Sequence, residues 1–318
     1  MTLLSICTTE TIKSAASALR SGNLVAFPTE TVYGLGADAS NQTAIAKLYA
    51  TKGRPADHPL IVHIASLDGM GQWARDIPDY AITLARDFWP GPMTLVLRRS
   101  KLAQDFITGG QDTVGLRVPA HPIALALINE FYNQGGLGIA APSANRFGAV
   151  SPTTAQAVEE ELSQYLLSDD LILDGGPCLV GVESTIIDCT GPAPMILRLG
   201  AITPLMVEES TGLVALESNP AAIRVSGSLD SHYSPKAKVI LDVVAETGDG
   251  LIAPDQIPTP NGVVRLAAPS TIEEYARDLY RALRSADQKG LEVVVVLQPG
   301  GDGLAAAIRD RLRRSATR

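Results

Sequence analysis

Two segments near the amino terminus bring hydroxyl groups and cations together in a way that suits a phosphate-bearing ligand. The loop of residues 28–36 follows an apolar run and holds three hydroxyl side chains, one carboxylate and two glycines. Lys52 and Arg54 stand beside Pro55 a short way along the chain. Arginine can contact a phosphate through two N–H groups, and lysine supplies a point charge. An alternative interpretation is that Lys52 and Arg54 only complement the dipole of a helix that ends there. The hydroxyl-rich loop nearby favours phosphate binding instead.

Two arginines interrupt apolar runs that are typical of buried strands. Arg117 lies within residues 114–118, and Arg198 lies within residues 195–199. A buried cation is costly unless it has a partner or a ligand, so two of them in one domain indicate a binding site. His63 interrupts a third apolar run, where a structural histidine and a ligand contact fit the pattern equally well.

Several familiar motifs are absent or misplaced. Gly34–Ala39 fits the dinucleotide pattern G-x-G-x-x-A, but six residues separate its first glycine from the strand that should precede it directly. The sequence has no P-loop, no G-x-S-x-G hydrolase elbow and no Cys/His cluster that would indicate zinc. Small polar groups in Pro142–Asn145 and Val182–Thr185 border strands, where ordinary turns or caps would also place them.

The composition is typical of a soluble globular protein with room for two domains. The chain has 318 residues, of which 46% are hydrophobic and 19% are charged. Its net charge of −8 disfavours a large nonspecific nucleic-acid surface. The three cysteines predict free thiols in a reducing compartment. With no signal peptide or membrane-spanning stretch in the pattern, the sequence predicts a cytoplasmic protein with no membrane partner.

The apolar periodicity predicts an α/β domain over residues 1–205. Its expected helices are residues 9–20, 42–52, 79–89, 122–132 and 153–166. Its expected strands are residues 24–27, 60–65, 93–97, 114–118, 138–141, 171–173, 185–187 and 195–199. Residues 206–237 are expected to form a linker with little regular structure. Residues 238–318 predict a small α/β domain with a partly parallel sheet, with strands at 239–243, 263–266 and 291–297 and helices at 272–286 and 303–313.

Taken in order, these motifs resemble the YrdC-like family. The resemblance rests on Phe27–Leu35, Lys52–Pro55, Pro59–Leu60, Gly115–Pro119, Pro142–Asn145 and Glu183–Thr185. Ser226–Leu229 with His232–Pro235 is similar to the interdomain linker of the two-domain members, which are L-threonylcarbamoyl-adenylate synthases. The resemblance implies a twisted open mixed sheet with flanking helices around a concave basic cavity, followed by a small Rossmann-like α/β domain. It also implies a nucleotidyltransferase that converts L-threonine, bicarbonate or CO2, and ATP into threonylcarbamoyl-AMP and pyrophosphate.

The resemblance further implies which residues form the site. Those that would hold L-threonine are Thr31, His63, Arg117, Ala141 through its backbone, and Ser184. Those that would hold ATP are Lys52, Arg54, His58, Thr113, Ser143, Ser151, Arg198 and Tyr233. Lys52 and Arg54 would be the catalytic cations, together with Mg²⁺ that arrives with ATP and has no protein ligands. His58 stands where members commonly carry asparagine.

The implied product would feed the threonylcarbamoyl modification of a tRNA adenosine through a downstream tRNA-modifying transferase complex. An alternative is an RNA-binding module of the same fold that binds RNA weakly on the concave surface and catalyses nothing. The acidic net charge argues against that alternative. A third hypothesis is a paralogue that acts on a different carbamoyl or acyl adenylate, which the linker motif disfavours.

Overall fold

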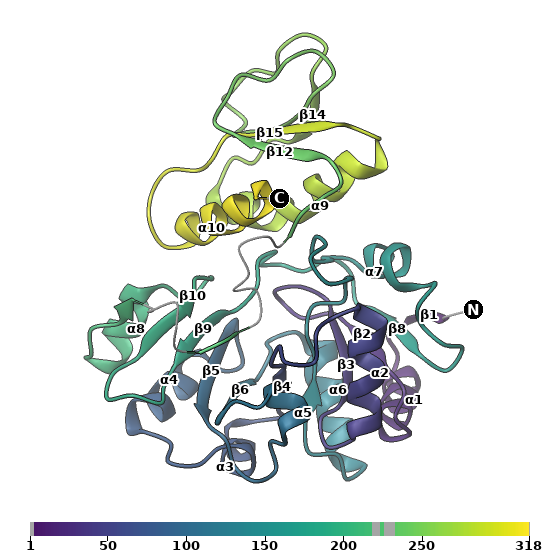
Figure 1. Cartoon of the computed structure of the whole chain (residues 1–318), viewed down its shortest axis with the longest axis vertical. Helices are drawn as coiled ribbons and strands as arrows, with labels where there is room; N and C mark the ends of the chain where they lie inside the picture. Colours follow the sequence, from purple (N-terminus) through teal and green to yellow (C-terminus); the bar gives the residue numbers. More distant parts are fainter. Residues whose placement is uncertain (1–2, 218–222, 226–232, 318) are drawn as a thin grey trace.

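The structure is a computed structural model that describes residues 3–217, 223–225 and 233–317 (Figure 1). A large amino-terminal domain, coloured purple to green, lies beside a smaller carboxyl-terminal domain, coloured green to yellow. Both combine helices with a sheet, and the sheet of the large domain is mixed, which confirms the predicted fold class. The linker motif Ser226–Leu229 and His232 lie outside the described residues.

The framework of the large domain is an eleven-stranded sheet. Its strands are β1 (Leu3–Ile6), β2 (Val25–Phe27), β3 (Gly34–Asp38), β4 (Ile61–His63), β5 (Met93–Arg98), β6 (Thr113–Arg117), β7 (Ile139–Ala140), β8 (Leu171–Asp174), β9 (Thr185–Asp188), β10 (Met195–Arg198) and β11 (Leu216–Glu217). They lie in the order β1-β8-β2-β3-β7-β4-β6-β5-β9-β10-β11. The pair β4–β6 is parallel and the pair β5–β6 is antiparallel. The last residues of β4 and β6, His63 and Arg117, therefore lie side by side at one edge of the sheet.

Helices cover both faces of this sheet. They are α1 (Thr9–Arg20), α2 (Gln42–Lys52), α3 (Met70–Trp73), α4 (Asp79–Phe88), α5 (Asp105–Thr108), α6 (Pro122–Asn133), α7 (Ala155–Leu162) and α8 (Pro204–Thr211), with a 3-10 turn at Leu67–Gly69. Successive residues of a strand face opposite sides. Val25 and Phe27 of β2 therefore pack with α1 and α6, whereas Leu24 and Ala26 join the core that contains α2, α4 and α7.

The hydroxyl-rich loop is shorter than the sequence suggests. Gly34 and Gly36, expected in the loop, belong to β3, which pairs antiparallel with β2. A Cβ atom at Gly36 would lie 2.8 Å from side-chain carbons of both Ile139 and Phe27, so only glycine allows this close packing. The loop that faces the cavity is therefore residues 28–33, held at both ends by the β2–β3 hairpin.

The beginning of the predicted linker forms regular structure that packs against the large domain. Thr203 caps α8 by accepting a hydrogen bond from the Met206 N–H, and Gly212 ends the helix in a left-handed conformation. Strand β11 then pairs parallel with β10. The weak helix that the sequence suggests after Pro204 is present as α8, and a short strand follows it, because the cap and the strand pairing stabilise a weakly patterned segment. The domain boundaries at residues 205 and 237 stay predictions.

The small domain has a four-stranded parallel sheet. Its strands are β12 (Lys238–Leu241), β13 (Gly250–Ile252), β14 (Val264–Ala267) and β15 (Val293–Val296). They lie in the order β12-β15-β13-β14. Strand β13 was not expected. Helices α9 (Ile272–Gln288) and α10 (Leu304–Ala316) lie on the side of this sheet that faces the large domain (Figure 1). Their apolar side chains form one core with Val32, Val150 and Val182 of the large domain. The two domains are thus packed together beside the hydroxyl-rich loop.

Among the helices of residues 3–217 and 233–317, none is both long and apolar enough to span a bilayer.

Candidate active site

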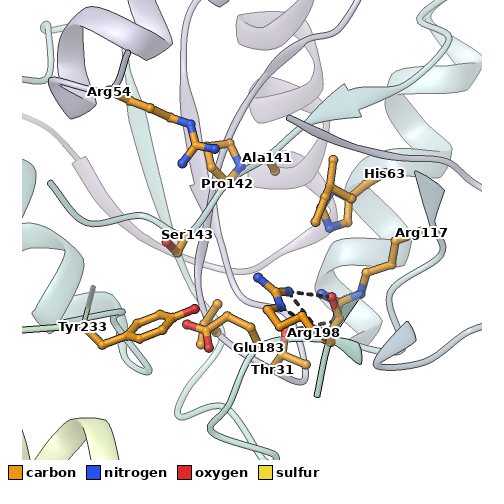
Figure 2. Close-up of a pocket in the computed structure, with 13 residues that line it drawn as sticks. Thr31, Arg54, His63, Arg117, Ala141, Pro142, Ser143, Glu183, Arg198 and Tyr233 are labelled. Atoms are coloured by element: carbon orange, nitrogen blue, oxygen red, sulfur yellow. Dashed lines mark hydrogen bonds between the residues drawn. The ribbon is translucent and has the colours of Figure 1, made fainter. Parts of the chain in front are cut away.

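A cavity lies between the hydroxyl-rich loop, the strand ends and Tyr233 (Figure 2). Nine of the thirteen residues that the family resemblance assigns to the site line it: Thr31, Arg54, His63, Arg117, Ala141, Ser143, Ser184, Arg198 and Tyr233. In the view of Figure 2, Arg54, Ser143 and Tyr233 lie on one side, and His63 and Arg117 lie on the other. The cavity therefore has two ends, each with at least one buried arginine.

Arg117 at the end of β6 is fixed by the hydroxyl-rich loop. Its Nη2 donates to Glu30 Oε1 at 2.7 Å and to Thr31 Oγ1 at 3.0 Å, and all three residues are buried. The other oxygen of Glu30 accepts from the Ala120 N–H at 3.0 Å. The carboxylate thus orients the guanidinium toward the cavity, where a planar cation of this kind suits the carboxylate of an amino acid.

His63 ends β4 beside this arginine. It is buried, and its ring meets the Phe27 ring edge to face at 6.2 Å. Burial and the charge of Arg117 lower the pKa of His63 to about 3, so the imidazole is neutral at physiological pH. Within the described residues its Nδ1 has no hydrogen-bond partner. A neutral imidazole with one nitrogen available can accept a hydrogen bond from the hydroxyl or amine of a ligand.

We expect replacement of His63 by glutamine to flatten the pH dependence of stability in acid. The unfolded chain binds a proton near the ordinary pKa of 6.5, whereas the folded protein binds it only near 3. The unfolded state thus holds more protons between these values, and the free energy of unfolding should fall as the pH falls through this window. Urea unfolding of the wild type and His63→Gln at several pH values measures this. Parallel curves would contradict a neutral buried His63.

Arg54 and Arg198 supply the positive charge at the other end. Arg54 follows α2, donates from Nη2 to the Pro59 carbonyl at 3.0 Å, and lies over the Phe147 ring at 5.7 Å. Arg198 ends β10 and donates to the Ser184 carbonyl from Nε at 3.0 Å and from Nη2 at 2.9 Å. Burial lowers the pKa of both guanidinium groups, to about 10 for Arg54. Desolvated cations attract an anionic ligand more strongly than solvated ones.

Four predicted site residues do not line the cavity. Lys52 is buried at the end of α2, where its Nζ donates to the Ser143 carbonyl at 2.5 Å and to the Asn145 carbonyl. It holds the wall that carries Ser143. Ser151 donates to Glu183 at 2.7 Å. His58 meets the Phe147 ring edge to face, and Thr113 lies in a neighbouring groove lined by Gln111 and Arg224. Their roles in nucleotide binding stay predictions.

Sequence reasoning missed Glu183 as a site residue, although its segment was noticed. Glu183 is buried, lines the cavity and accepts three hydrogen bonds, from Ser151, Tyr280 and Arg311. The signal that could have identified it is a carboxylate two residues before a buried strand. Tyr280 and Arg311 belong to amphipathic helices of the small domain, and nothing in their local pattern separates them from ordinary helix residues.

Comparison with known proteins identifies relatives along the whole chain. The pattern of the Sua5/YciO/YrdC family, described as "Telomere recombination", matches residues 17–200, and that of "Threonylcarbamoyl-AMP synthase, C-terminal domain" matches residues 198–317. The threonylcarbamoyl-AMP synthase of Pyrococcus abyssi is 40% identical over 96% of this chain and 94% of its own length, and that of Bacillus subtilis is 37% identical over 96% and 92%. The crystal structure of P. abyssi Sua5 complexed with L-threonine superposes with a TM-score of 0.89, at 38% identity over 99% of this chain and 98% of that one.

Proposed function

The chain belongs to the Sua5/YciO/YrdC family, among its two-domain threonylcarbamoyl-AMP synthases, and we propose that its cavity joins L-threonine, bicarbonate or CO2, and ATP into threonylcarbamoyl-AMP and pyrophosphate. The observation that carries the proposal is the assembly of one cavity from segments between residues 31 and 233. Nine residues assigned from the resemblance meet there, although they come from distant parts of the chain.

The two ends of the cavity suit the two substrates. Arg117, oriented by Glu30, would bind the threonine carboxylate, while Thr31, His63 and the Ala141 backbone would contact the rest of the amino acid. A relative of known structure was crystallised with L-threonine, which supports this assignment. Arg54 and Arg198, with Ser143 and Tyr233, would hold the nucleotide. Ser184 also lines the cavity, where its hydroxyl accepts from Arg198 at 3.1 Å and shares a hydrogen bond with Thr94 at 2.8 Å.

The proposed reaction brings two anions together, so charge compensation is its main requirement. The carbamate formed on threonine must attack the α-phosphate of ATP, and pyrophosphate must leave. Arg54 and Arg198 would spread the negative charge that develops on the phosphoryl group, in a site where water no longer screens it. Alignment of the two substrates then suffices without a covalent protein nucleophile. On this basis we assign the enzyme to the nucleotidyltransferases.

Mg²⁺ fits this cavity as a companion of the triphosphate. Two buried carboxylates, Glu183 in the cavity wall and Glu30 behind Arg117, already accept hydrogen bonds on both oxygens. We therefore propose that the ion is held by phosphate oxygens, where it would neutralise the leaving pyrophosphate.

The wider role follows from the chemistry of the product. A threonylcarbamoyl adenylate is an activated donor, so we propose that a tRNA-modifying transferase complex consumes it, which would place the protein in the cytoplasm. The RNA-binding alternative is not favoured, because the relatives at near full length are synthases.

Incubation of the purified protein with L-threonine, bicarbonate, Mg²⁺ and ATP tests the proposal. We expect pyrophosphate release that requires both threonine and bicarbonate, and a product that contains the bicarbonate carbon. L-Serine in place of threonine tests the paralogue hypothesis. Absence of threonine-dependent release would refute the proposal, and RNA binding that depends steeply on salt but not on ATP or threonine would favour the alternative.

A further inference from the structure

The small domain reaches the wall of the cavity through two buried side chains. Arg311 of α10 donates from Nε to Glu183 Oε2 at 2.9 Å. Tyr280 of α9 donates its hydroxyl to the same oxygen at 2.8 Å. Both residues are fully buried and neither lines the cavity, whereas Glu183 does. The small domain is therefore connected to the cavity wall by hydrogen bonds to this carboxylate.

Hydrogen bonds hold Glu183 on both of its oxygens. Oε1 accepts from Ser151 at 2.7 Å, and Oε2 accepts from Tyr280 and Arg311. Burial alone would raise the pKa of this carboxyl, but the charges of Arg311 and Arg198 outweigh burial and lower the pKa to about 2. The carboxylate is consequently ionised at neutral pH, and its charge is compensated from the small domain.

Arg311 is itself fixed in one orientation. Its Nη1 donates to Asp310 Oδ2 at 2.6 Å and its Nη2 donates to the Leu199 carbonyl at 2.7 Å, next to Arg198 in the large domain. Its guanidinium lies over the Tyr233 ring at 5.5 Å, and that ring stacks on Tyr280 at 5.5 Å. The same two residues thus position Glu183 and Tyr233, both of which line the cavity.

A carboxylate in the wall of a triphosphate site needs this compensation. Uncompensated, it would repel the phosphates at short range in a poorly screened environment. We propose that Arg311 and Tyr280 are positioning residues of the small domain, which hold Glu183 as a neutralised, fully hydrogen-bonded anion and so make the cavity accept ATP. This inference rests on the proposed function, because it takes the ligand at that end to be a triphosphate.

The proposal predicts that ATP binding becomes pH-dependent when Arg311 is replaced, which a purely structural contact between the domains would not produce. The groups around Glu183 are Arg198 on β10, Tyr233 on the linker, Tyr280 on α9, and Asp310 and Arg311 on α10. Without Arg311, burial should raise the pKa of Glu183 toward the working range. Its ionisation at higher pH would then oppose ATP binding, and its protonation at lower pH would relieve the repulsion.

Steady-state kinetics of Arg311→Met test this prediction. We expect the KM for ATP to rise about tenfold at about pH 8, but to stay within about threefold of the wild type at about pH 5.5. The KM for L-threonine should change by less than about twofold at both pH values. Arg313→Met, an exposed arginine on the same helix, is the matched control and should behave as the wild type.

Second-site variants separate charge compensation from folding. Glu183→Gln combined with Arg311→Met should remove the pH dependence of the KM for ATP, because no carboxylate remains to ionise. Arg311→Lys, which keeps the charge, should restore most of the ATP affinity. If Arg311→Met does not fold, Tyr280→Phe removes a single hydroxyl from Glu183 and should raise the KM for ATP in the same pH-dependent direction, by about threefold.

The outcomes distinguish this inference from the proposed function. If the wild type is active and the Arg311→Met and Tyr280→Phe variants both have the wild-type KM for ATP at every pH, the positioning role is overturned. The proposed function would stand in that case. A pH-independent loss that Glu183→Gln does not relieve would also overturn it. A wild type without threonine-dependent pyrophosphate release would overturn the proposed function, and calorimetric titration of the same variants with ATP would then decide the positioning role.

Discussion

Replacing Arg54 by alanine is expected to lower the rate of threonine-dependent pyrophosphate release by about 10²–10³-fold. Arg54 is the buried cation on the Ser143 side of the cavity, and its pKa of about 10 leaves it charged at neutral pH. Its charge would act mainly on the transferring phosphoryl group, where negative charge develops. The loss should therefore appear in kcat at saturating ATP as well as in KM.

Two further variants make this prediction specific. Arg54→Lys keeps a charge but loses the planar fork, so we expect an activity between those of the wild type and the alanine variant. Arg75→Ala removes an arginine of the same domain whose side chain is 48% exposed, and it should leave kcat unchanged. An Arg54→Ala protein that folds and keeps full activity would contradict the phosphate assignment.

Replacing Arg117 by methionine is expected both to destabilise the large domain and to abolish threonine binding. The substitution leaves Glu30 buried without its ion-pair partner at 2.7 Å. Breaking a buried pair in this way costs about 3–5 kcal/mol in the free energy of unfolding. Denaturant unfolding measures that cost, and calorimetric titration with L-threonine measures binding.

The double variant Glu30→Gln with Arg117→Met separates the two effects. Glutamine removes the uncompensated charge and keeps an oxygen for the Ala120 N–H, so most of the lost stability should return. Threonine binding should stay absent, because the cation that receives its carboxylate is gone. Recovery of binding in the double variant would mean that Arg117 serves only to neutralise Glu30.

Local sequence patterns predict the chemistry of the site better than its exact geometry. Arg117 and Arg198 were identifiable because a cation in an apolar strand is costly, and both line the cavity. Lys52 was also expected to bind phosphate, because Arg54 and the hydroxyl-rich loop are near it in the sequence. Its Nζ instead donates hydrogen bonds to two backbone carbonyls. A cation at a helix end can bind either a ligand or backbone carbonyls, depending on which loop packs against it. For Lys52 that loop contains Ser143, which is 91 residues away in the sequence.

The contribution of the small domain could not be predicted for a related reason. Arg311 lies in a helix with several other arginines, and its burial depends on how α10 packs against the large domain. Its contact with Glu183 joins residues 128 positions apart. Periodicity predicts which face of a helix is apolar, but not which polar group the opposite domain presents to it. Short elements such as β11 and β13 were missed because pairing partners, rather than their own residues, stabilise them.

Calorimetric titration of the wild-type protein with L-threonine and with ATP and Mg²⁺, separately and together, tests the central claim most directly. We predict one site for each ligand, with threonine binding lost in the Glu30→Gln, Arg117→Met double variant and ATP binding weakened in Arg54→Ala. If neither ligand gives a heat of binding, whether alone or in the presence of the other, the claim that this cavity holds an amino acid against a triphosphate is contradicted.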